Sequence, residues 1–380
     1  MIFPEKKIGI LGGGQLGKML CIAAAPWHLK IAVLDKDPSF PAAPYCTEFV
    51  KGDFSEYDDV MNFGKDLDII TIEIEGVNSK ALHDLKKMGK AVFPDPEFLD
   101  IVKDKGRQNQ FYRVHRLPTT RFSSFDQLTK LKEKVDNGDW KFPFVWKSRF
   151  EGYDGRGVAI VKSDDELNSL PKGACLIEEL VDIEKELAII VCRNENGEKS
   201  VYGAVEMVFH EANLLDQLES PANIDPAIEH KMKEIAFELV DSVDYRGILA
   251  IEFFLDKKGN LLINEVAPRP HNSGHHTIEC CPCSQYEQLI RMILNLPPGD
   301  TTSTQQGIMF NLLGHPDYSG QAKIEGFQQA LNTKNVHLHW YGKPQTRPMR
   351  KMGHVVVAGE NRKEILSTAE DLKKKIIIKS

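Results

Sequence analysis

Apolar and polar positions along the first hundred residues follow the pattern of a parallel α/β domain. Short apolar runs predict strands, and a helix is expected from Gln15 to Ala25. The strands are expected at residues 7–11, 31–35, 68–72 and 91–94, of which 68–72 is apolar enough to be buried on both faces. This alternation of strands and helices predicts a Rossmann-like domain over residues 1–100.

The following two hundred residues have a less regular pattern, which predicts a second domain over residues 101–300. A mostly helical stretch from about Asp100 to Val114 leads into it. Strands are expected at 144–147, 157–161, 175–178, 187–192 and 201–207, and helices at 226–243 and 286–294. The segment Pro297-Pro298-Gly299-Asp300 marks a boundary, and residues 301–380 predict a small α+β unit. The expected fold class is therefore α/β and α+β.

Two apolar runs in the second domain each contain one glutamate. The runs 248–255 and 261–266 flank Asp256-Lys257-Lys258-Gly259-Asn260, which is typical of a hairpin turn. If the turn centres on Lys258 and Gly259, Glu252 lies opposite Glu265. Facing Cβ atoms in an antiparallel pair are about 5 Å apart, and like charges there repel. A hard divalent cation, most simply Mg²⁺, would hold such a pair together.

A glycine-rich segment about a hundred residues upstream points to the same ligand. Glu151-Gly152-Tyr153-Asp154-Gly155-Arg156-Gly157 is typical of a loop whose backbone N–H groups approach phosphate oxygens. Lys147, in the preceding strand, can act as a point charge on phosphate. The loop alone is equally consistent with a mobile hairpin tip. Together with the carboxylate pair it predicts nucleotide triphosphate chemistry.

A second glycine motif stands at the start of the chain. Gly12-Gly13-Gly14-Gln15-Leu16-Gly17 matches the dinucleotide fingerprint, and Asp35 ends the next strand about 20 residues on. By itself this motif supports an NAD-dependent oxidoreductase. The alternative is a strand–turn–helix packing device whose helix N-terminus receives another anion. Nicotinamide chemistry leaves the second glycine loop and the facing glutamates unexplained, so we favour the alternative.

Composition limits the class of protein. The 380 residues include 42% hydrophobic and 27% charged residues, and this length favours two or three domains. The net charge of −7 and the pI near 6.0 argue against nucleic acid as the main partner. No apolar run approaches membrane length and no signal-peptide pattern is present. Seven cysteines without regular spacing indicate reduced thiols and a cytoplasmic protein.

Histidines and cysteines gather near residue 275 and raise the hypothesis of a zinc site. Its candidate ligands would be His271, His275, His276, Cys280, Cys281 and Cys283. The cysteine spacing is C-C-x-C, whereas zinc sites commonly use clean C-x₂-C pairs. We therefore favour buried thiols beside a glycine-rich turn.

The order of these motifs resembles that of the ATP-grasp superfamily: a lysine-bearing strand, a glycine loop, Glu178-Glu179-Leu180-Val181 and a two-glutamate hairpin. The first glycine motif, the segment 267–275 (Ala-Pro-Arg-Pro-His-Asn-Ser-Gly-His) and the segment 347–354 (Arg-Pro-Met-Arg-Lys-Met-Gly-His) narrow the match. Over its full length the chain resembles the N5-carboxyaminoimidazole ribonucleotide synthase family. Two positions depart from the family pattern. Glu151 replaces the glycine that usually opens the loop, and Lys105 replaces an arginine, which keeps the charge but loses the bidentate fork.

The resemblance implies an ATP-grasp architecture with a lid subdomain at about 115–180 and no fused mutase. It implies ATP- and bicarbonate-dependent carboxylation of 5-aminoimidazole ribonucleotide through carboxyphosphate, with Mg²⁺ or Mn²⁺, in a cytoplasmic homodimer. The implied ATP contacts are Lys105, Lys147, Gly152, Tyr153, Asp154, Gly155, Arg156, Gly157, Val158, Glu178, Glu179, Val181, Glu186, His210, Asn264 and Glu265.

The other implied roles concern the metal, the reaction and the second substrate. Glu252 and Glu265 would be the metal ligands. The catalytic group would be Tyr153, Asp154, Arg156 and Arg269, and the substrate-binding group Gln15, Glu73, Arg269, His271, Lys343 and Arg350. Either Asp154 or a substrate phosphate could remove the amine proton. An ATP-grasp ligase that uses formate or an amino acid, and a nucleotide sensor without turnover, remain alternatives.

Overall fold

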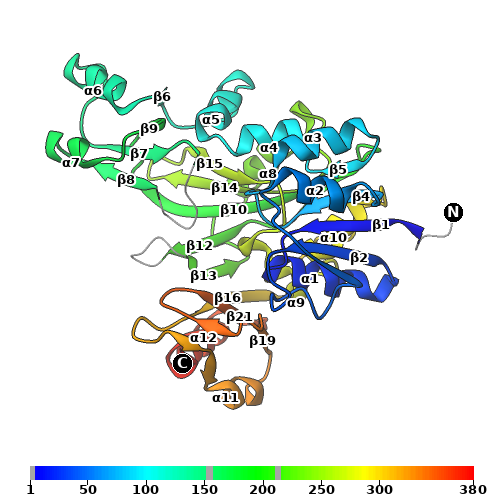
Figure 1. The fold of residues 1–380 in the computed structure, drawn as a ribbon. Helices are drawn as coiled ribbons and strands as arrows, with labels where there is room; N and C mark the ends of the chain where they lie inside the picture. Colours follow the sequence, from blue (N-terminus) through cyan, green and yellow to red (C-terminus); the bar gives the residue numbers. More distant parts are fainter. Residues whose placement is uncertain (1–4, 151–156, 210–214) are drawn as a thin grey trace.

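The computed structural model describes residues 5–150, 157–209 and 215–380 (Figure 1). Its first domain is a parallel five-stranded sheet in the order β3-β2-β1-β4-β5, with helices on both faces. The predicted strands are confirmed, and β3 is an edge strand that the pattern did not reveal. The bounds are β1 Lys7–Leu11, β2 Lys30–Asp35, β3 Glu48–Lys51, β4 Ile69–Ile72, β5 Ala91–Phe93, α1 Gln15–Ala24, α2 Tyr57–Gly64 and α3 Ser79–Lys87.

The helical stretch predicted from Asp100 to Val114 is two helices, α4 (Pro96–Val102) and α5 (Lys105–Val114). The two helices are separate because Asp104 adopts an extended backbone between them and caps α5. An antiparallel sheet in the order β6-β9-β7-β8 follows, with helices α6 and α7 packed on it. Its bounds are β6 Phe122–Phe125, β7 Phe144–Ser148, β8 Val158–Val161, β9 Cys175–Glu179, α6 Leu128–Asp136 and α7 Asp164–Ser169.

A nine-stranded sheet forms the centre of the molecule, in the order β15-β14-β10-β12-β13-β16-β21-β19 with β11 beside β10. The strand predicted at 201–207 is instead two, β11 and β12, because the buried Tyr202 ends the first and donates its hydroxyl to the carbonyl of Cys283. The bounds are β10 Ile183–Arg193, β11 Lys199–Val201, β12 Val205–Phe209, β13 Leu215–Ser220, β14 Gly247–Asp256, β15 Leu261–Ala267, β16 Gln306–Leu313, β19 Val336–Trp340, β21 Lys351–Gly359 and α8 Pro226–Ser242.

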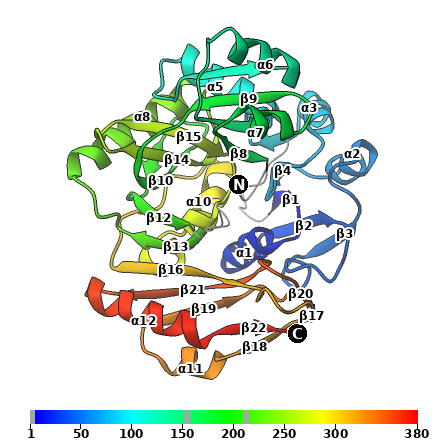
Figure 2. The same ribbon diagram turned by 90° about the vertical axis from the view of Figure 1, so that its left-hand side faces the viewer.

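Three strands of the last eighty residues, β16, β21 and β19, belong to the same sheet (Figure 2). Strand β16 pairs with β13, so the domain boundary predicted after residue 300 falls between strands of one continuous sheet. Two short strand pairs and two helices complete the C-terminal unit. They are β17 Gly320–Gln321 with β20 Gln345–Thr346, β18 Lys323–Glu325 with β22 Ile377–Lys379, α11 Phe327–Asn332 and α12 Arg362–Lys375.

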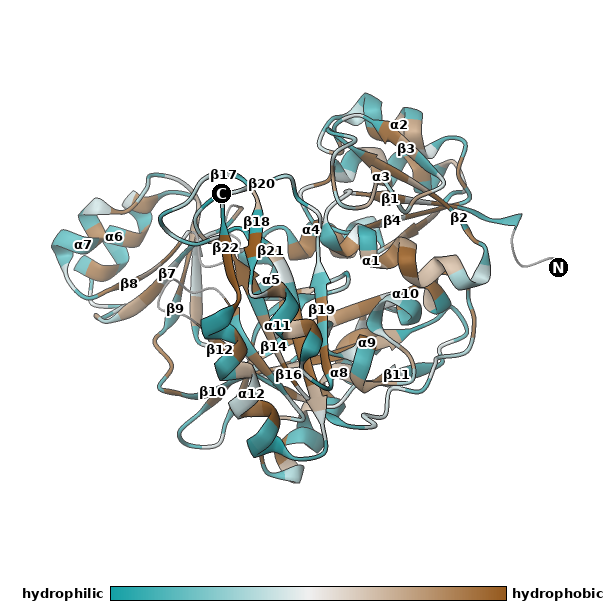
Figure 3. Cartoon of the chain, turned by 90° about the horizontal axis from the view of Figure 1, so that it is seen from below, coloured by the Kyte–Doolittle hydropathy of each residue, from teal (hydrophilic) through white to brown (hydrophobic). Residues whose placement is uncertain are grey.

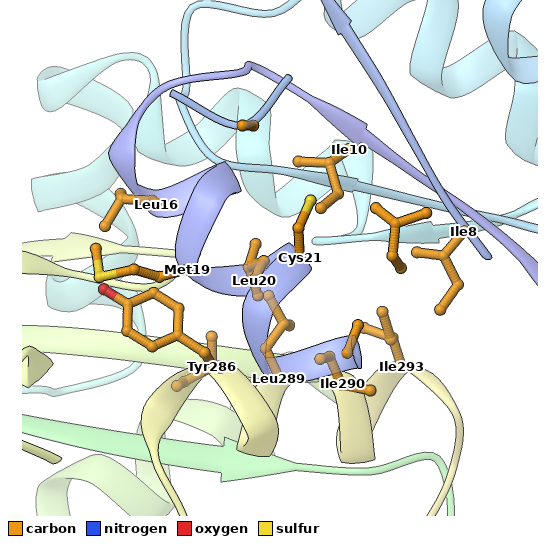
Figure 4. Packing of buried hydrophobic residues seen from close by; sticks show 14 of the residues in the cluster. Ile8, Ile10, Leu16, Met19, Leu20, Cys21, Tyr286, Leu289, Ile290 and Ile293 are labelled. Atoms are coloured by element: carbon orange, nitrogen blue, oxygen red, sulfur yellow. The ribbon is translucent and has the colours of Figure 1, made fainter. Parts of the chain in front are cut away.

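The first domain is fixed to the central one by helix-on-helix packing. Helix α1 lies against α10 (Gln285–Ile293), and Figure 4 shows their apolar side chains interleaved. Leu20 and Leu289, one from each helix, are at least 95% buried. In Figure 3 the strands β1, β2 and β4 are largely brown, the colour of hydrophobic residues, whereas the helices α6 and α7 mix teal with brown. Burial of this apolar interface gives the strand ends of the first domain a fixed place beside the large sheet.

Candidate active site

The two-glutamate hairpin forms from β14 and β15, and Glu252 pairs with Glu265 as predicted. The turn is nevertheless one residue tighter than predicted, because Leu255 pairs with Leu261 and Phe253 with Ile263. A β-bulge at Asn264 then restores the predicted pairing. In such a bulge two residues oppose one on the partner strand, so Asn264 and Glu265 both face Glu252.

Two lysines from different elements converge on this hairpin. Lys105, the first residue of α5, places its Nζ 2.6 Å from Glu265 Oε2. Lys147 of β7 places its Nζ 3.1 Å from Asn264 Oδ1 and 2.9 Å from Glu178 Oε2. The structure therefore brings together five residues that lie up to 160 positions apart.

The glutamates around the hairpin carry more negative charge than the lysines balance. Burial, and then the charges of Glu265 and Glu186, raise the pKa of Glu252. The Lys105 cation lowers the pKa of Glu265, against the effect of burial. Burial raises the pKa of Glu186 to about 7. Counting Glu178 as well, four carboxylates face two lysines, which leaves two negative charges when all are ionised.

The segment predicted to bind adenine connects β9 to β10. Glu178 is buried and accepts hydrogen bonds from Asn109 (2.7 Å) as well as pairing with Lys147. Glu179 is exposed, and Val181 is half-buried in the connection. Glu186 lies two residues before Ala188, the partner of Glu252, so both glutamates are on one face of the sheet.

Sequence reasoning did not identify Asn109. Its spacing from Lys105 is the signal that could have found it, because residues four apart share a helix face.

Only the C-terminal flank of the glycine loop is described. Gly157 has a φ of +73° and its carbonyl accepts a hydrogen bond from Ser148 (2.8 Å). Val158 pairs with Lys147 at the start of β8. The other predicted positions lie outside the described residues, namely Gly152, Tyr153, Asp154, Gly155, Arg156 and His210.

The segment after the hairpin places one arginine and one histidine beside the carboxylates. Arg269 pairs with Glu75 at 2.8 Å. His271 Nε2 lies 3.5 Å from Glu252 Oε1, and its Nδ1 is 2.9 Å from Ser273 Oγ. Glu75 follows β4 at the carboxyl edge of the parallel sheet, where ligand sites of α/β domains are found. That position is the signal that could have identified Glu75 from the sequence.

The backbone N–H groups of the first glycine motif already bind a carboxylate of the protein itself. Glu73 accepts hydrogen bonds from the N–H groups of Gly14 (2.9 Å) and Gly17 (3.0 Å), at the start of α1. Asp35 accepts one from Gly13 (2.6 Å). These are the donors that a dinucleotide pyrophosphate would need. The geometry therefore supports a strand–turn–helix packing motif rather than a dinucleotide-binding site. Gln15 is the first residue of α1.

The cations of the C-terminal unit lie in the loops around β20. Lys343 donates to the carbonyl of Lys351 (2.7 Å), and Arg350 to that of Gln345 (2.7 Å). Burial and the neighbouring Arg347 lower the pKa of Arg350. This unit is also joined to α1, because Lys18 Nζ donates to the carbonyl of Trp340 (2.6 Å), a contact that sequence reasoning missed.

The candidate zinc residues have separate partners. His275 Nδ1 contacts Tyr286 Oη (2.8 Å), His276 Nδ1 contacts the carbonyl of Ser273 (3.1 Å), and the Cys283 thiol donates to Gln288 (3.2 Å). Within residues 5–150, 157–209 and 215–380, no three His, Cys, Asp or Glu side chains are grouped to hold a metal ion. The same residues contain no helix long and apolar enough to cross a membrane.

Three families of known protein domains match consecutive regions of the chain. Residues 5–103 match the ribonucleotide synthetase preATP-grasp domain, 110–286 the ATP-grasp domain, and 307–368 the phosphoribosylaminoimidazole carboxylase C-terminal domain. The N5-carboxyaminoimidazole ribonucleotide synthase of Bacillus subtilis is 34% identical over 93% of this chain and 92% of its own length. The chain spans 66% of the length of the phosphoribosylaminoimidazole carboxylase of Vigna aconitifolia, at 36% identity over 96% of this chain.

Solved structures that resemble this chain belong to enzymes of the same name. N5-carboxyaminoimidazole ribonucleotide synthetase from Thermotoga maritima superposes with a TM-score of 0.91, at 38% identity and 99% coverage of both chains. The enzyme from Aspergillus clavatus in complex with ADP and 5-aminoimidazole ribonucleotide superposes with a TM-score of 0.89, at 30% identity and 98% coverage of both chains. This chain belongs to the N5-carboxyaminoimidazole ribonucleotide synthase family, the ATP-dependent ligases that carboxylate 5-aminoimidazole ribonucleotide in purine biosynthesis.

Proposed function

We propose that this chain uses ATP and bicarbonate to convert 5-aminoimidazole ribonucleotide into N5-carboxyaminoimidazole ribonucleotide, with ADP and phosphate as the other products. The observation that carries the proposal is the paired Glu252 and Glu265 flanked by Lys105 and Lys147. Lysines suit phosphate oxygens, and a carboxylate pair suits a divalent cation that accompanies a nucleotide triphosphate.

The carboxylates present fit Mg²⁺, or Mn²⁺ in its place. Mg²⁺ is commonly held by one or two carboxylates together with substrate phosphates, so two protein ligands are sufficient. When all four carboxylates around Glu252 are ionised, the two negative charges that the lysines leave unbalanced equal the charge of one such ion. When bound, the cation neutralises charge on the β- and γ-phosphates. Glu252 and Glu265 would hold it, and Asn264 would lie beside it on the bulge.

The nucleotide is proposed to lie between the β7–β8 hairpin and the large sheet. Lys105 and Lys147 would bind the phosphates, and the segment 152–158 would cover them. The connection at Glu179 and Val181 would contact the adenine edge, and Glu186 the ribose. The geometry supports Glu178 as a positioning residue, because its carboxylate already bonds Lys147 and Asn109. The proposed contact of His210 lies outside the described residues.

The reaction requires two substrates beside the γ-phosphate. A bicarbonate oxygen attacks that phosphorus and ADP leaves, which gives carboxyphosphate. Carboxyphosphate then delivers CO₂ to the exocyclic amine, and phosphate is released. Arg269, paired with Glu75, would hold an anion, and His271, close to Glu252, would lie beside the same substrates. Tyr153, Asp154 and Arg156 would complete the pocket, with Asp154 or a phosphate oxygen taking the amine proton.

The ribonucleotide is proposed to lie between the first domain and the C-terminal unit. Lys343 and Arg350 would receive its phosphate. Support comes from the Lys18–Trp340 contact, which brings α1 and the start of this cationic region together. Gln15, at the start of the same helix, would reach the substrate. Glu73 bonds the backbone of this turn, which supports a positioning role rather than direct contact.

The proposal is tested by measuring ADP release with 5-aminoimidazole ribonucleotide present, with and without bicarbonate. We expect release to require bicarbonate and to match the carboxylated product one to one. Stimulation by formate but not bicarbonate would indicate a different ATP-grasp ligase. ATP binding with no release under any condition would indicate a nucleotide sensor.

We also propose a cytoplasmic homodimer. The family resemblance supports the dimer, and the seven cysteines, all free thiols in the structure, support a reducing compartment. Sedimentation equilibrium measures the assembly directly, and a monomer at micromolar concentration would contradict it.

A further inference from the structure

The N-terminus of helix α5, which begins with Lys105, is joined to the end of strand β7 through Arg149. The first N–H groups of a helix have no partner inside it. The Lys105 N–H donates to the carbonyl of Arg149 (3.0 Å). Asp104 Oδ1 accepts from the N–H groups of Gly106 (2.9 Å) and Arg107 (3.2 Å). Three donors at this helix start therefore have partners, and one of those partners is Arg149.

The side chain of Arg149 makes a second, stronger connection to the same place. Its Nε and Nη2 lie 2.9 and 2.6 Å from the two carboxylate oxygens of Asp104. The Asp104 side chain is 7% exposed. Burial works against ionisation of Asp104, but the Arg149 guanidinium and the backbone N–H groups of Arg107 and Gly106 together outweigh it and lower the pKa of this carboxyl. Arg149 also contacts Asp126 at 2.8 Å, but that aspartate is 93% exposed, and such pairs contribute little.

Gly106 makes this close approach feasible. A Cβ at position 106 would lie 2.9 Å from Arg149 Nε and 2.6 Å from Ser124 Oγ. Any larger side chain at this position would push the guanidinium away from the helix. The three residues Asp104, Gly106 and Arg149 thus form one contact, which we name the α5–β7 clamp.

The clamp connects the two elements that carry the phosphate-binding lysines. Lys147 precedes Arg149 by two residues, so one end of β7 reaches Asn264 while the residue beyond it reaches Asp104. Along α5, Lys105 reaches Glu265 and Asn109 reaches Glu178. The spacing between the two lysines therefore depends on how the start of α5 is held against β7.

We propose that Arg149 and Asp104 are positioning residues for ATP, whose ion pair holds Lys105 and Lys147 at the spacing needed to bind one triphosphate. The proposal rests on the function proposed above for the two lysines. Neither Asp104 nor Arg149 is among the groups that face the carboxylate pair. A misplacement of about 1 Å can cost roughly a hundredfold in rate, so a change in this spacing has a measurable consequence.

The decisive variant is Asp104→Asn. Asparagine caps a helix as well as aspartate does, so α5 keeps its cap and loses only the charged pairing with Arg149. Asp126→Asn is the matched control, because it removes the other carboxylate from the same guanidinium. We expect the KM for ATP to rise about tenfold or more in Asp104→Asn, with the KM for 5-aminoimidazole ribonucleotide unchanged. In Asp126→Asn both constants should stay within about twofold.

A double-mutant cycle separates positioning from general support of the fold. If the clamp acts through Lys105, the fold increase in the KM for ATP of Asp104→Asn/Lys105→Ala should be far smaller than the product of the fold increases of the two single variants. Fully multiplicative effects would overturn the proposal, as would equal increases in both substrate constants. An unchanged KM for ATP in Lys105→Ala would instead contradict the proposed function of the lysine.

Arg149→Lys provides the second test if Asp104→Asn folds poorly. Lysine keeps the charge but loses the planar fork, so the KM for ATP should again rise while that for the ribonucleotide does not. Wild-type values for this variant, at normal thermal stability, would overturn the proposal.

Discussion

Glu73 and Glu252 are both partly buried glutamates, but their surroundings differ in a way that separates fold from function. The carboxylate of Glu73 receives two backbone N–H groups at the start of α1. Glu252 faces Glu265 on the next strand, and Glu186 lies on the same face of the sheet. The backbone donors favour the ionised form of Glu73 and so oppose the burial that raises its pKa. The carboxylates beside Glu252 instead add to the effect of burial and raise its pKa, so its charge must be balanced by a proton or by a bound cation.

The same contrast applies to two arginines proposed to bind substrate. Arg269 has an ionised partner, Glu75, at 2.8 Å. Arg350 donates to a backbone carbonyl and lies near Arg347, and within the described residues it has no carboxylate within ion-pair distance. The charge of Arg350 is therefore the more available for a substrate phosphate.

Glu265→Gln tests the functional side of the comparison and should have the largest effect. Loss of one ligand from a two-carboxylate site removes several kcal/mol of charge stabilisation, so turnover should fall about a thousandfold or more. The fold should persist, because the change relieves repulsion with Glu252. Steady-state ADP release at saturating Mg²⁺ measures the effect.

The control for this variant is Glu206→Gln. Glu206 lies on β12 of the same sheet and pairs with Lys185 rather than with the glutamates. It should retain near-normal turnover. Equal turnover in the two variants would mean that the hairpin glutamates are structural.

Glu73→Gln tests the structural side. Replacing a carboxylate that accepts two backbone N–H groups should lower the free energy of unfolding by about 2 kcal/mol. Urea unfolding measures this change. Glu56→Gln is the control, since Glu56 lies at the start of helix α2 but its side chain makes no capping hydrogen bond. Normal stability with a raised KM for the ribonucleotide would show instead that Glu73 contacts substrate, as the family resemblance implies.

The sequence supported much of this picture because the motifs act locally. The hairpin composition predicted that Glu252 faces Glu265, and the order of motifs predicted that Lys147 belongs to the same site. The bulge at Asn264 was not predictable, since one extra residue in a strand is decided by packing on both sides of the sheet. Likewise Glu75 gains its partner Arg269 only when the first domain docks on the second, and no local pattern records that event.

Arg350→Ala sharpens the contrast between the two arginines. A charge-assisted hydrogen bond contributes roughly 1.5–3 kcal/mol, which corresponds to about ten- to a hundredfold in affinity. We expect the KM for 5-aminoimidazole ribonucleotide to rise by that factor, with the KM for ATP nearly unchanged. Initial-rate measurements with each substrate varied separately decide the matter. A selective rise in the ATP constant would place the nucleotide, not the ribonucleotide, at the C-terminal unit.

The smallest effect is expected from pH, through Glu186. Its pKa rises from 4.5 to about 7 on burial, so the folded protein binds its proton more tightly than the unfolded chain does. The stability that this group contributes is complete below pH 4.5 and is lost as the pH rises through about 7.

Glutamine at position 186 mimics the protonated form of Glu186. The free energy of unfolding of wild type, minus that of Glu186→Gln, should therefore fall by about 1–2 kcal/mol between pH 5 and pH 8, without nucleotide or Mg²⁺. Taking this difference cancels the titration of the other groups, and urea unfolding at each pH supplies it. Added Mg²⁺ without nucleotide should reduce the slope, because its positive charge stabilises the ionised carboxylates. A difference that rises with pH would show that Glu186 already has a cationic partner in the folded chain. The count of two unbalanced charges around Glu252 would then be too high, and the case for a divalent cation would rest on the hairpin alone.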